Sequence, residues 1–309
     1  MARIRIGTSG WSYDEWRGPF YPEGLPASER LRFASRRLDT IEVNASFYSR
    51  LRPETYRKWG EQVPSGFVLA VKGPRFVTHV RRLAEVQGPL ANFFASGVLL
   101  LGRKLGPILW QLPASMPFDP SRLEAFLQAL PRDQRAAVRL GAEAAPPPAA
   151  DALPHGPGPR RLRHALEVRN PDALRPELVR MLRRHRVALV VSDAGRWPLV
   201  EEVTAAWVYV RLHGRPRTYA SAYSRASLRR WAARVVCWAR GGSPPDAKRI
   251  SQEPPPAHAA RDVYVYFDND RGAHAPADAL ALARLVREAE AAGQGGRAPP
   301  RGARAWPHR

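Results

Sequence analysis

The chain has 309 residues, a formal net charge of +21 and a single cysteine. That length suits one α/β barrel or two ordinary domains. One cysteine excludes an internal disulfide framework and any multi-cysteine zinc or iron–sulfur site. The N-terminal residues contain no signal-like apolar stretch, and no run reaches the length of a membrane span. We therefore expect a cytoplasmic protein with no membrane partner.

Arginine dominates the basic residues, since only four of the 49 are lysine, at Lys58, Lys72, Lys104 and Lys248. Arginine, alanine and proline are all abundant, which is typical of a GC-rich coding sequence whatever the protein binds. The charge balance is also typical of a surface that faces a polyanion. Both interpretations stay open at the level of sequence.

Eight short apolar runs with strand character recur along the chain. They begin near Ile4, Thr40, Phe67, Gly106, His164, Ala188, Ala206 and Asp262. Helical patterns lie between most of them, at residues 28–38 with Ser28 as N-cap, 53–62, 83–102 with a break near Gly97, from Asp119 onward, 176–185, 227–239 and 276–289. Alternating strands and helices predict a parallel sheet, and eight strands predict closure into a (β/α)8 TIM-like barrel.

A doubly wound open sheet is the alternative fold. It is less favoured because no glycine-rich dinucleotide fingerprint or phosphate-loop motif follows a strand. We expect one barrel domain over residues 1–289. Within it, the proline-, alanine- and glycine-rich stretches at about 142–159 and 241–260 are predicted to be loose insertions. Residues 290–309 are predicted to form a disordered basic tail.

Polar residues share one face of several predicted strands. Side chains alternate faces along a strand, so Glu42 lies on the same side as Asn44, Glu167 as Arg169, and Arg211 as His213. In a (β/α)8 barrel, active sites form at the carboxyl ends of the strands. We therefore expect a polar mouth built from distant parts of the chain. The candidate catalytic residues are Glu42, Glu167, Asp193, His213 and Asp268, and the candidate ligand-binding residues are Trp11, Asn44, Tyr48, Lys72, Gln111, Arg169, Arg211 and Asn269.

Several motifs occur in order between Arg3 and about Leu285. They include Gly7-Thr8-Ser9-Gly10-Trp11-Ser12-Tyr13, Glu42-Val43-Asn44, Gln111-Leu112-Pro113, Ser192-Asp193, Tyr209-Val210-Arg211-Leu212-His213-Gly214 and Tyr266-Phe267-Asp268-Asn269-Asp270. Together they resemble the YecE-like family, also called domain of unknown function seventy-two. The resemblance implies a TIM-barrel-type fold and supplies no reaction. After Arg169 the family usually has a histidine followed by serine and tryptophan, whereas this chain has Asn170-Pro171-Asp172, so no histidine role is carried over there.

The first functional hypothesis is acid–base catalysis, of a hydrolase, isomerase or lyase type, on a phosphorylated, acidic or sugar-like ligand. Glu167 or Glu42 would act as acid or base with His213 as partner. Arg169, Arg211 and Lys72 would bind phosphate or carboxylate. The competing interpretation is structural, in which the same charges pair across the mouth and bind nothing.

Two further hypotheses concern metals and nucleic acids. No cofactor is predicted, and a divalent metal is the less favoured alternative because Arg169 and Arg211 would oppose a cation. Its dispersed candidate ligands are His79, Glu167, Asp193, His213, Asp268 and His274. A nucleic-acid-binding or nucleic-acid-processing barrel is the alternative function, because basic and aromatic residues alternate at 215–223 after the seventh strand. The sequence leaves the oligomeric state open.

Overall fold

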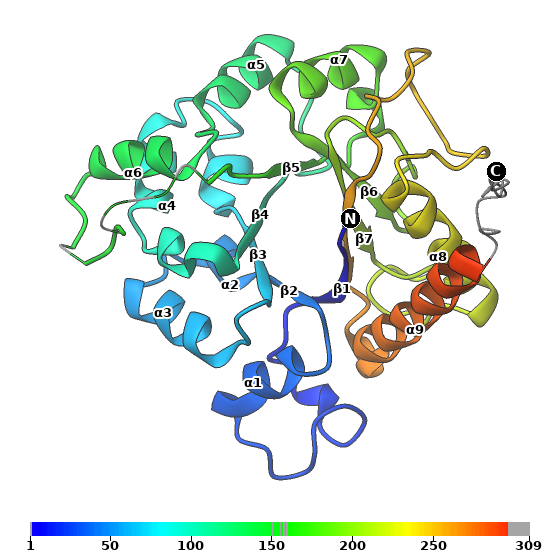
Figure 1. Cartoon of the computed structure of the whole chain (residues 1–309). Helices are drawn as coiled ribbons and strands as arrows, with labels where there is room; N and C mark the ends of the chain where they lie inside the picture. Colours follow the sequence, from blue (N-terminus) through cyan, green and yellow to red (C-terminus); the bar gives the residue numbers. More distant parts are fainter. Residues whose placement is uncertain (1, 150, 155, 157, 159, 296–309) are drawn as a thin grey trace, which may run out of the picture.

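The computed structural model describes residues 2–149, 151–154, 156, 158 and 160–295. Its centre is a closed barrel of eight parallel strands that follow one another in chain order, with the last paired to the first (Figure 1). The strands are β1 (Ile4–Ser9), β2 (Thr40–Val43), β3 (Val68–Lys72), β4 (Leu105–Gln111), β5 (His164–Glu167), β6 (Ala188–Asp193), β7 (Trp207–Leu212) and β8 (Asp262–Phe267). The predicted (β/α)8 TIM-like barrel is confirmed.

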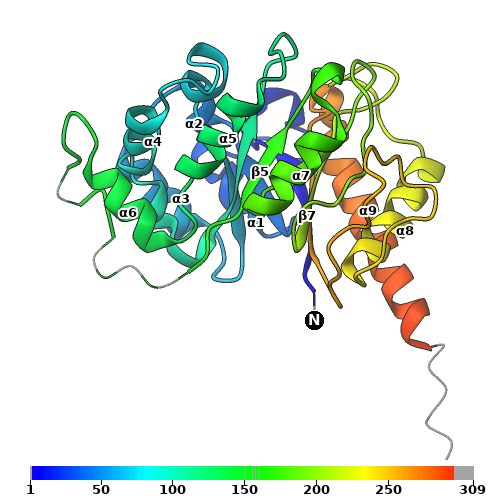
Figure 2. The same cartoon turned by 90° about the horizontal axis from the view of Figure 1, so that it is seen from above.

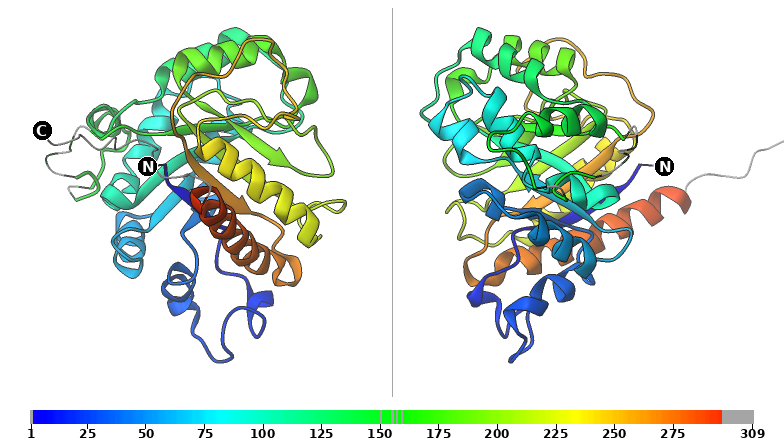
Figure 3. Two further views of the ribbon diagram at one scale, coloured as in Figure 1. Left: turned by 45° about the vertical axis from the view of Figure 1, so that its right-hand side comes forward. Right: turned by 90° about the vertical axis from the view of Figure 1, so that its left-hand side faces the viewer.

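Helices surround the barrel and cover its outer surface (Figures 1 and 2). They are α1 (Arg30–Ser35), α2 (Ala45–Tyr48), α3 (Pro53–Gln62), α4 (Gln87–Phe94), α5 (Pro120–Ala129), α6 (Gln134–Ala142), α7 (Pro176–His185), α8 (Arg225–Ala239) and α9 (His274–Gly295). Figure 3 shows α8 and α9 side by side on the outside of the sheet. The outward-facing strand residues Val43, Leu166 and Val210 are fully buried under this helical layer, as their alternation predicts.

Two helix predictions need correction, and one helix has no counterpart among the predictions. Ser28 does not cap a helix, because α1 begins at Arg30 and no side chain bonds its first turn. No helix starts at Leu83, whose φ of 65° lies in the left-handed region, and α4 begins at Gln87 instead. Helix α6 was not predicted, although Asp133 caps it in the usual way by accepting from Ala136 N at 2.8 Å.

At the first expected insertion, about 142–159, Ala142 ends α6 and the described residues of this stretch after it contain no helix or strand. Helix α9 continues to Gly295, past residue 290 where the tail was expected to begin, and residues 296–309 of the expected tail lie outside the described part of the chain. Residues 241–260 contain no helix or strand. Their backbone is nevertheless held by Glu202, which accepts hydrogen bonds from the N–H groups of Ile250 and Ser251 at 3.1 and 3.2 Å. Within the described residues, no helix is long and apolar enough to cross a membrane.

An apolar cluster separate from the outer core fills the inside of the barrel. Its members include Ala70, Leu109, Ala165, Val190 and Tyr266, all buried. These side chains belong to the inward-facing layer of the strands. This apolar layer packs beneath the polar residues at the carboxyl ends of the strands.

Candidate functional site

Arg211 on β7 is the centre of the polar mouth, and all three of its guanidinium nitrogens donate to protein acceptors. Nε and Nη2 bind the two oxygens of Glu42 at 3.1 and 2.8 Å. Nη1 binds Glu167 at 2.9 Å, and Nη2 also binds Asp268 at 3.0 Å. Strands β2, β5 and β7 and the end of β8 thus supply one fully buried cluster. The structure thus brings Glu42, Glu167, Asp268 and Arg211 together in one cluster, as strand alternation predicts.

Hydroxyl groups complete the shell around the carboxylates. The Ser9 hydroxyl donates to Glu42 at 2.5 Å and accepts from Asn44 Nδ2 at 2.8 Å. The Tyr209 hydroxyl donates to the other Glu42 oxygen at 2.6 Å. Ser192 donates to Glu167 at 3.0 Å. Buried carboxylates are costly unless their oxygens are paired, and these partners supply the pairing.

His213 lies between two carboxylates. Its Nε2 is 3.1 Å from Glu167 Oε1 and its Nδ1 is 2.9 Å from Asp268 Oδ2, although the second contact is not aligned as a hydrogen bond. Ionised carboxylates only accept hydrogen bonds, so a proton on Nε2 has Glu167 as its hydrogen-bond acceptor. The rings of Trp197 and Tyr219 pack edge-on against the imidazole, with centroids at 5.2 and 5.4 Å.

Glu167 and Asp268 are held in the ionised form. Burial raises the pKa of Glu167, but Arg169 and Arg211 outweigh it and hold that pKa well below the usual 4.5. Burial likewise raises the pKa of Asp268, and Arg211 with His213 brings it far below the usual 3.8. Opposite charges within a few ångströms favour the charged form, which is the dominant effect in both cases.

Asp270 behaves in the opposite way, two residues beyond Asp268. Burial, and then the neighbouring charge of Asp268, raise the pKa of Asp270 to about 9. One of its oxygens is buried without a hydrogen-bond partner among the described residues. The site therefore combines an ionised carboxylate, Asp268, with a protonated one, Asp270. Enzymes that use one carboxyl group as base and another as acid have this combination.

Lys72 at the end of β3 is a buried cation of the mouth that pairs with no carboxylate among the described residues. Its amine stands 4.1 Å from the centre of the Phe47 ring and makes no hydrogen bond or ion pair within the described residues. The residue is 7% exposed. Burial and the charge of Arg211 lower the pKa of Lys72 to about 8, against the opposing effects of the nearby carboxylates.

The side of the mouth around β3 to β5 carries further polar groups. Arg169 stacks over Trp197 at 4.3 Å and reaches Glu167 only at 3.4 Å. His79 lies near Gln111, and His79 Nε2 is 3.4 Å from Gln111 Nε2. Burial lowers the pKa of His79 to about 4, and Lys72 and Arg169 are among the cations that lower it further. Cations thus gather on this side of the mouth, and the carboxylates gather around Arg211.

Four predicted site residues lie outside this cluster. Asp193 follows Ser192 on β6, so its side chain points to the other face of the strand. There its carboxylate accepts hydrogen bonds from Arg215 Nε and from the Tyr223 hydroxyl. Asn269 donates to Ser221 O at 3.0 Å and to Asp278 at 2.8 Å, joining the loops after β7 and β8. Trp11 packs edge-on against Trp59 at 5.2 Å. Tyr48 stands at the rim and is 71% exposed.

Tyr209 and Asp270 are members of the site that sequence reasoning missed. Tyr209 precedes Arg211 by two residues, so strand alternation places both on the inner face and could have identified it. Asp270 follows β8 in a loop, where no periodicity predicts the direction of a side chain. Tyr13, whose hydroxyl donates to Ser9 O at 2.7 Å, was missed for the same reason.

Five of the twelve buried side-chain polar atoms that lack a hydrogen-bond partner within the described residues lie at this end of the barrel. Among the described residues they include Asn44 Oδ1, Arg169 Nε, Asn269 Oδ1 and Asp270 Oδ1. Buried polar groups in native proteins are almost always hydrogen-bonded, so each such atom calls for an explanation. A bound polar molecule would supply partners for several of them.

A hollow of about 510 Å³ adjoins the cluster. It is lined by residues of the loops after β6, β7 and β8, including Arg196, Arg217, Tyr219 and Arg271. Tyr219 connects the two regions because its ring also packs against His213. Gly195 must be glycine here, since a Cβ would lie 2.3 Å from Pro216 O. The mouth therefore has room for a small ligand beside the charged cluster, in a lining rich in arginine.

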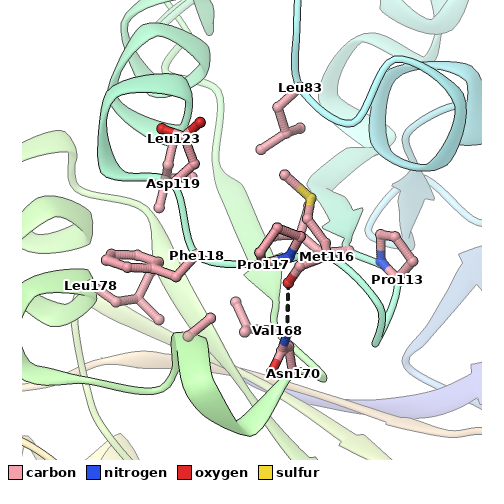
Figure 4. Close-up of a pocket in the computed structure, with 12 residues that line it drawn as sticks. Leu83, Pro113, Met116, Pro117, Phe118, Asp119, Leu123, Val168, Asn170 and Leu178 are labelled. Atoms are coloured by element: carbon pink, nitrogen blue, oxygen red, sulfur yellow. Dashed lines mark hydrogen bonds between the residues drawn. The ribbon is translucent and has the colours of Figure 1, made fainter.

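A different hollow lies outside the sheet, between the loops that follow β4 and β5 (Figure 4). Its lining is mostly apolar, with Leu83, Met116 and Leu178 among it, and its volume is about 20 Å³. That volume is close to the space for one water molecule. Asn170, at the position where the chain departs from the family pattern, donates to Met116 O at 2.8 Å and accepts from Asp172 N at 3.0 Å. This region is a packing void with a structural asparagine.

The residues that the structure describes contain no group of three or more histidine, cysteine, aspartate or glutamate side chains arranged to hold a metal ion. Of the six candidate ligands, Glu167, His213 and Asp268 do meet, but the Arg211 guanidinium lies among them. A divalent cation there would face a permanent positive charge.

Comparison with known proteins identifies relatives of the chain. The family model described as "Protein of unknown function DUF72" matches residues 5–303. The UPF0759 protein YecE of Escherichia coli K12 is 29% identical over 131 residues. That match covers 41% of this chain and 44% of the relative, so the alignment spans less than half of YecE.

Two solved structures share the fold over nearly the whole chain. A DUF72 family protein from Thermotoga maritima, TM1631, has a TM-score of 0.70 and 23% identity, covering 92% of this chain and 99% of its own. A DUF72 family protein from Enterococcus faecalis V583, EF0366, has a TM-score of 0.66 and 17% identity, covering 92% and 95%. At these identities the likeness supports the fold alone.

Proposed function

Because this chain belongs to the DUF72 family, whose description assigns no activity, we propose a function from its own residues. The barrel mouth binds a small anionic or polyhydroxylated ligand, such as a sugar phosphate or a hydroxy acid, and catalyses proton transfer on it. Lys72 and Arg169 bind the anionic group. His213, oriented by Glu167, is the proton-transfer residue.

The observation that carries the proposal is the buried, unpaired amine of Lys72. Glu42, Glu167 and Asp268 all bind Arg211, and none of them binds Lys72. A buried cation without a partner is destabilising, and a fold that needed only stability would contain an apolar side chain there. A ligand anion that binds Lys72 would remove that cost.

The geometry around His213 supports proton transfer. A histidine base is oriented through one ring nitrogen and transfers the proton through the other. Here Glu167 orients the ring at Nε2 at 3.1 Å, and Nδ1, which makes no aligned hydrogen bond to Asp268, is the nitrogen left for proton transfer. Glu167 is held so firmly ionised that it serves better as the orienting group than as the base. Asp270, protonated at neutral pH, is the second group able to donate a proton to the ligand.

Thermal-shift titration tests the binding step. Wild-type protein, Lys72→Met and Lys58→Met are each titrated with a panel of sugar phosphates, hydroxy acids and inorganic phosphate. Lys58 is an exposed lysine on α3 and serves as the matched control. A ligand that binds only the folded state stabilises it by RT ln(1 + L/Kd), where L is the free ligand concentration, so the melting temperature rises with that concentration. We expect at least one compound to stabilise wild type and Lys58→Met and to lose its effect in Lys72→Met.

A different result is expected if the charged groups of the mouth serve stability alone and bind no ligand. If Lys72 only fills space, no compound in the panel stabilises wild type more than Lys72→Met. Turnover is followed separately, by proton NMR of the stabilising compound in D2O. His213→Asn and Glu167→Gln should abolish exchange or conversion of that compound while the Lys58→Met control keeps it.

A second candidate function is supported by the rim of the mouth. Tyr48, Phe76 and Tyr219 are 71%, 49% and 38% exposed, and they follow β2, β3 and β7 respectively. Arg81 lies over the Phe76 ring at 5.9 Å. Exposed aromatic rings beside arginines are the surface on which single-stranded nucleic acid stacks.

Filter binding with a fifteen-nucleotide oligothymidine tests the second candidate. Alanine at a stacking aromatic costs about 1–3 kcal/mol of binding, so Tyr48→Ala should weaken binding roughly fivefold or more. Leu280→Ala, at an exposed apolar residue on α9, is the control. Equal affinity of both variants across a salt series would reduce the interaction to unspecific charge.

A further inference from the structure

A larger hollow lies at the opposite end of the barrel from the mouth, at the amino ends of the strands. Its volume is about 1550 Å³, and its lining includes the strand residues Val68, Leu105, His164, Trp207 and Asp262. Each of these is the first residue of its strand. Figure 2 shows the N-terminus, which precedes β1, emerging at this end.

The lining of this hollow is strongly positive. Ten arginines line it, against two carboxylates, Asp133 and Asp262. Arg163, Arg183 and Arg184 pair with carboxylates. The other seven arginines make no ion pair within the described residues.

Two of the unpaired arginines are fixed by backbone carbonyls. Arg132 donates to Leu127 O at 2.8 Å and to His185 O at 2.5 Å. Arg160 donates to Leu105 O at 2.8 Å and also to Gly102 O. A carbonyl accepts a hydrogen bond without cancelling the charge. These guanidinium groups are therefore held in place while their positive charge stays uncompensated.

The arginines also act on one another. Burial lowers the pKa of Arg132, and the neighbouring Arg186 lowers it further. Burial lowers the pKa of Arg160, with Arg163 and Arg103 adding to the effect. Like charges held close together in this way are destabilising, and the repulsion disappears when an anion lies between them.

We infer that this hollow binds a chain of phosphoryl groups, recognised through the phosphates alone. Its volume exceeds that of one phosphate ion, and its unpaired arginines come from several segments that surround it. Trp207 and Tyr264 line it but are only 5% and 6% exposed, with Arg163 over both rings at 5.7 Å. No open face of either ring is available for a base to stack, in contrast to the rim of the mouth.

Isothermal titration calorimetry of the full chain with sodium tripolyphosphate tests the inference. The variant carries Arg103→Gln, Arg161→Gln and Arg186→Gln, all exposed and without ion pairs, so the fold should persist. The control carries Arg36→Gln, Arg225→Gln and Arg229→Gln, three exposed arginines on or beside outer helices. Both proteins have the same net charge.

We expect the hollow variant to lose at least tenfold in tripolyphosphate affinity and the control to lose less than twofold. Lys72→Met should keep the tripolyphosphate binding that the hollow variant loses, which separates this site from the mouth. Equal losses in variant and control would overturn the inference in favour of unspecific charge. Tighter binding of a fifteen-nucleotide oligothymidine than of a linear polyphosphate of the same charge, lost in the same variant, would overturn recognition through phosphates alone. Absence of heat at millimolar tripolyphosphate at two well-separated temperatures would exclude the site.

Discussion

Arg211 and Glu42 bind each other across the barrel through two hydrogen bonds, from Nε at 3.1 Å and from Nη2 at 2.8 Å. The residues lie on β7 and β2, and both are fully buried. A two-pronged contact between a guanidinium and a carboxylate is the strongest form of such a pair. It fixes the position of Arg211, to which Glu167 and Asp268 then bind.

Removing the Arg211 guanidinium should strongly lower the free energy of unfolding. Arg211→Met leaves three carboxylates buried without their shared cation, and breaking a buried pair costs about 3–5 kcal/mol. Urea unfolding at pH 7 measures the free energy of unfolding. Arg229→Met, at an exposed position on α8, should change it by less than about 0.5 kcal/mol. A loss below about 1 kcal/mol in Arg211→Met would mean that the carboxylates do not depend on Arg211.

Asp270→Asn should stabilise the protein increasingly as the pH rises. The pKa of Asp270 is raised to about 9 by burial, so between about pH 4 and pH 9 the folded state keeps a proton that the unfolded state has lost. Wild-type stability therefore falls across this window because of Asp270, by at most about 1.4 kcal/mol per pH unit. Asparagine removes that dependence.

Urea unfolding of wild type and Asp270→Asn at pH 5, 6, 7 and 8 measures the effect. The difference between the two proteins should widen at each step. Glu61→Gln is the control, because it also removes one carboxylate but at an exposed position near the end of α3. A constant difference from pH 5 to pH 8 would show that Asp270 is ionised throughout.

The strands and the polar cluster follow from the sequence because both depend on period-two alternation. All eight predicted strand starts lie within one residue of the observed ones. Glu42, Glu167 and Arg211 were identified because each sits on an inner face beside outward-facing aliphatic residues. Asp193 shows where this reasoning fails, since the inner-facing residue of β6 is Ser192, one position earlier.

The remaining features depend on tertiary packing, which a single sequence does not show. The raised pKa of Asp270 results from burial in a loop and from Asp268. The arginine-lined hollow joins Arg103, Arg132 and Arg186, which are far apart in the chain and have no shared motif. Short helices such as α2 (Ala45–Tyr48) are too brief to produce a periodic pattern.

The response to acid should differ between wild type and Glu167→Gln. The pKa of Glu167 is depressed by Arg169 and Arg211, so its stabilising contribution is complete above the unfolded value of 4.5 and is lost as the pH falls toward the folded value. Glu167→Gln should therefore be less stable than wild type at pH 7, and the gap should narrow below pH 4.5. Guanidinium unfolding at pH 7 and pH 3.5 measures the gap, and an unchanged gap would contradict the depressed pKa.

Lys72 should titrate near neutrality. Burial and Arg211 lower the pKa of its amine to about 8. The chain has only four lysines, so reductive methylation with ¹³C-formaldehyde gives a spectrum simple enough to assign. The signal absent from Lys72→Arg belongs to Lys72, and its midpoint should lie near pH 8. A midpoint above pH 10 would show an amine that is either solvated or paired with a carboxylate.

The same labelled protein provides the most direct test of ligand binding at the mouth. The compound from the panel that stabilises wild type is added, and the pH titration is repeated. We predict that the Lys72 signal moves on addition and that its midpoint rises above about 8, because a bound anion favours the charged amine. A compound that stabilises the protein but leaves the Lys72 signal and its midpoint unchanged would contradict the proposed site.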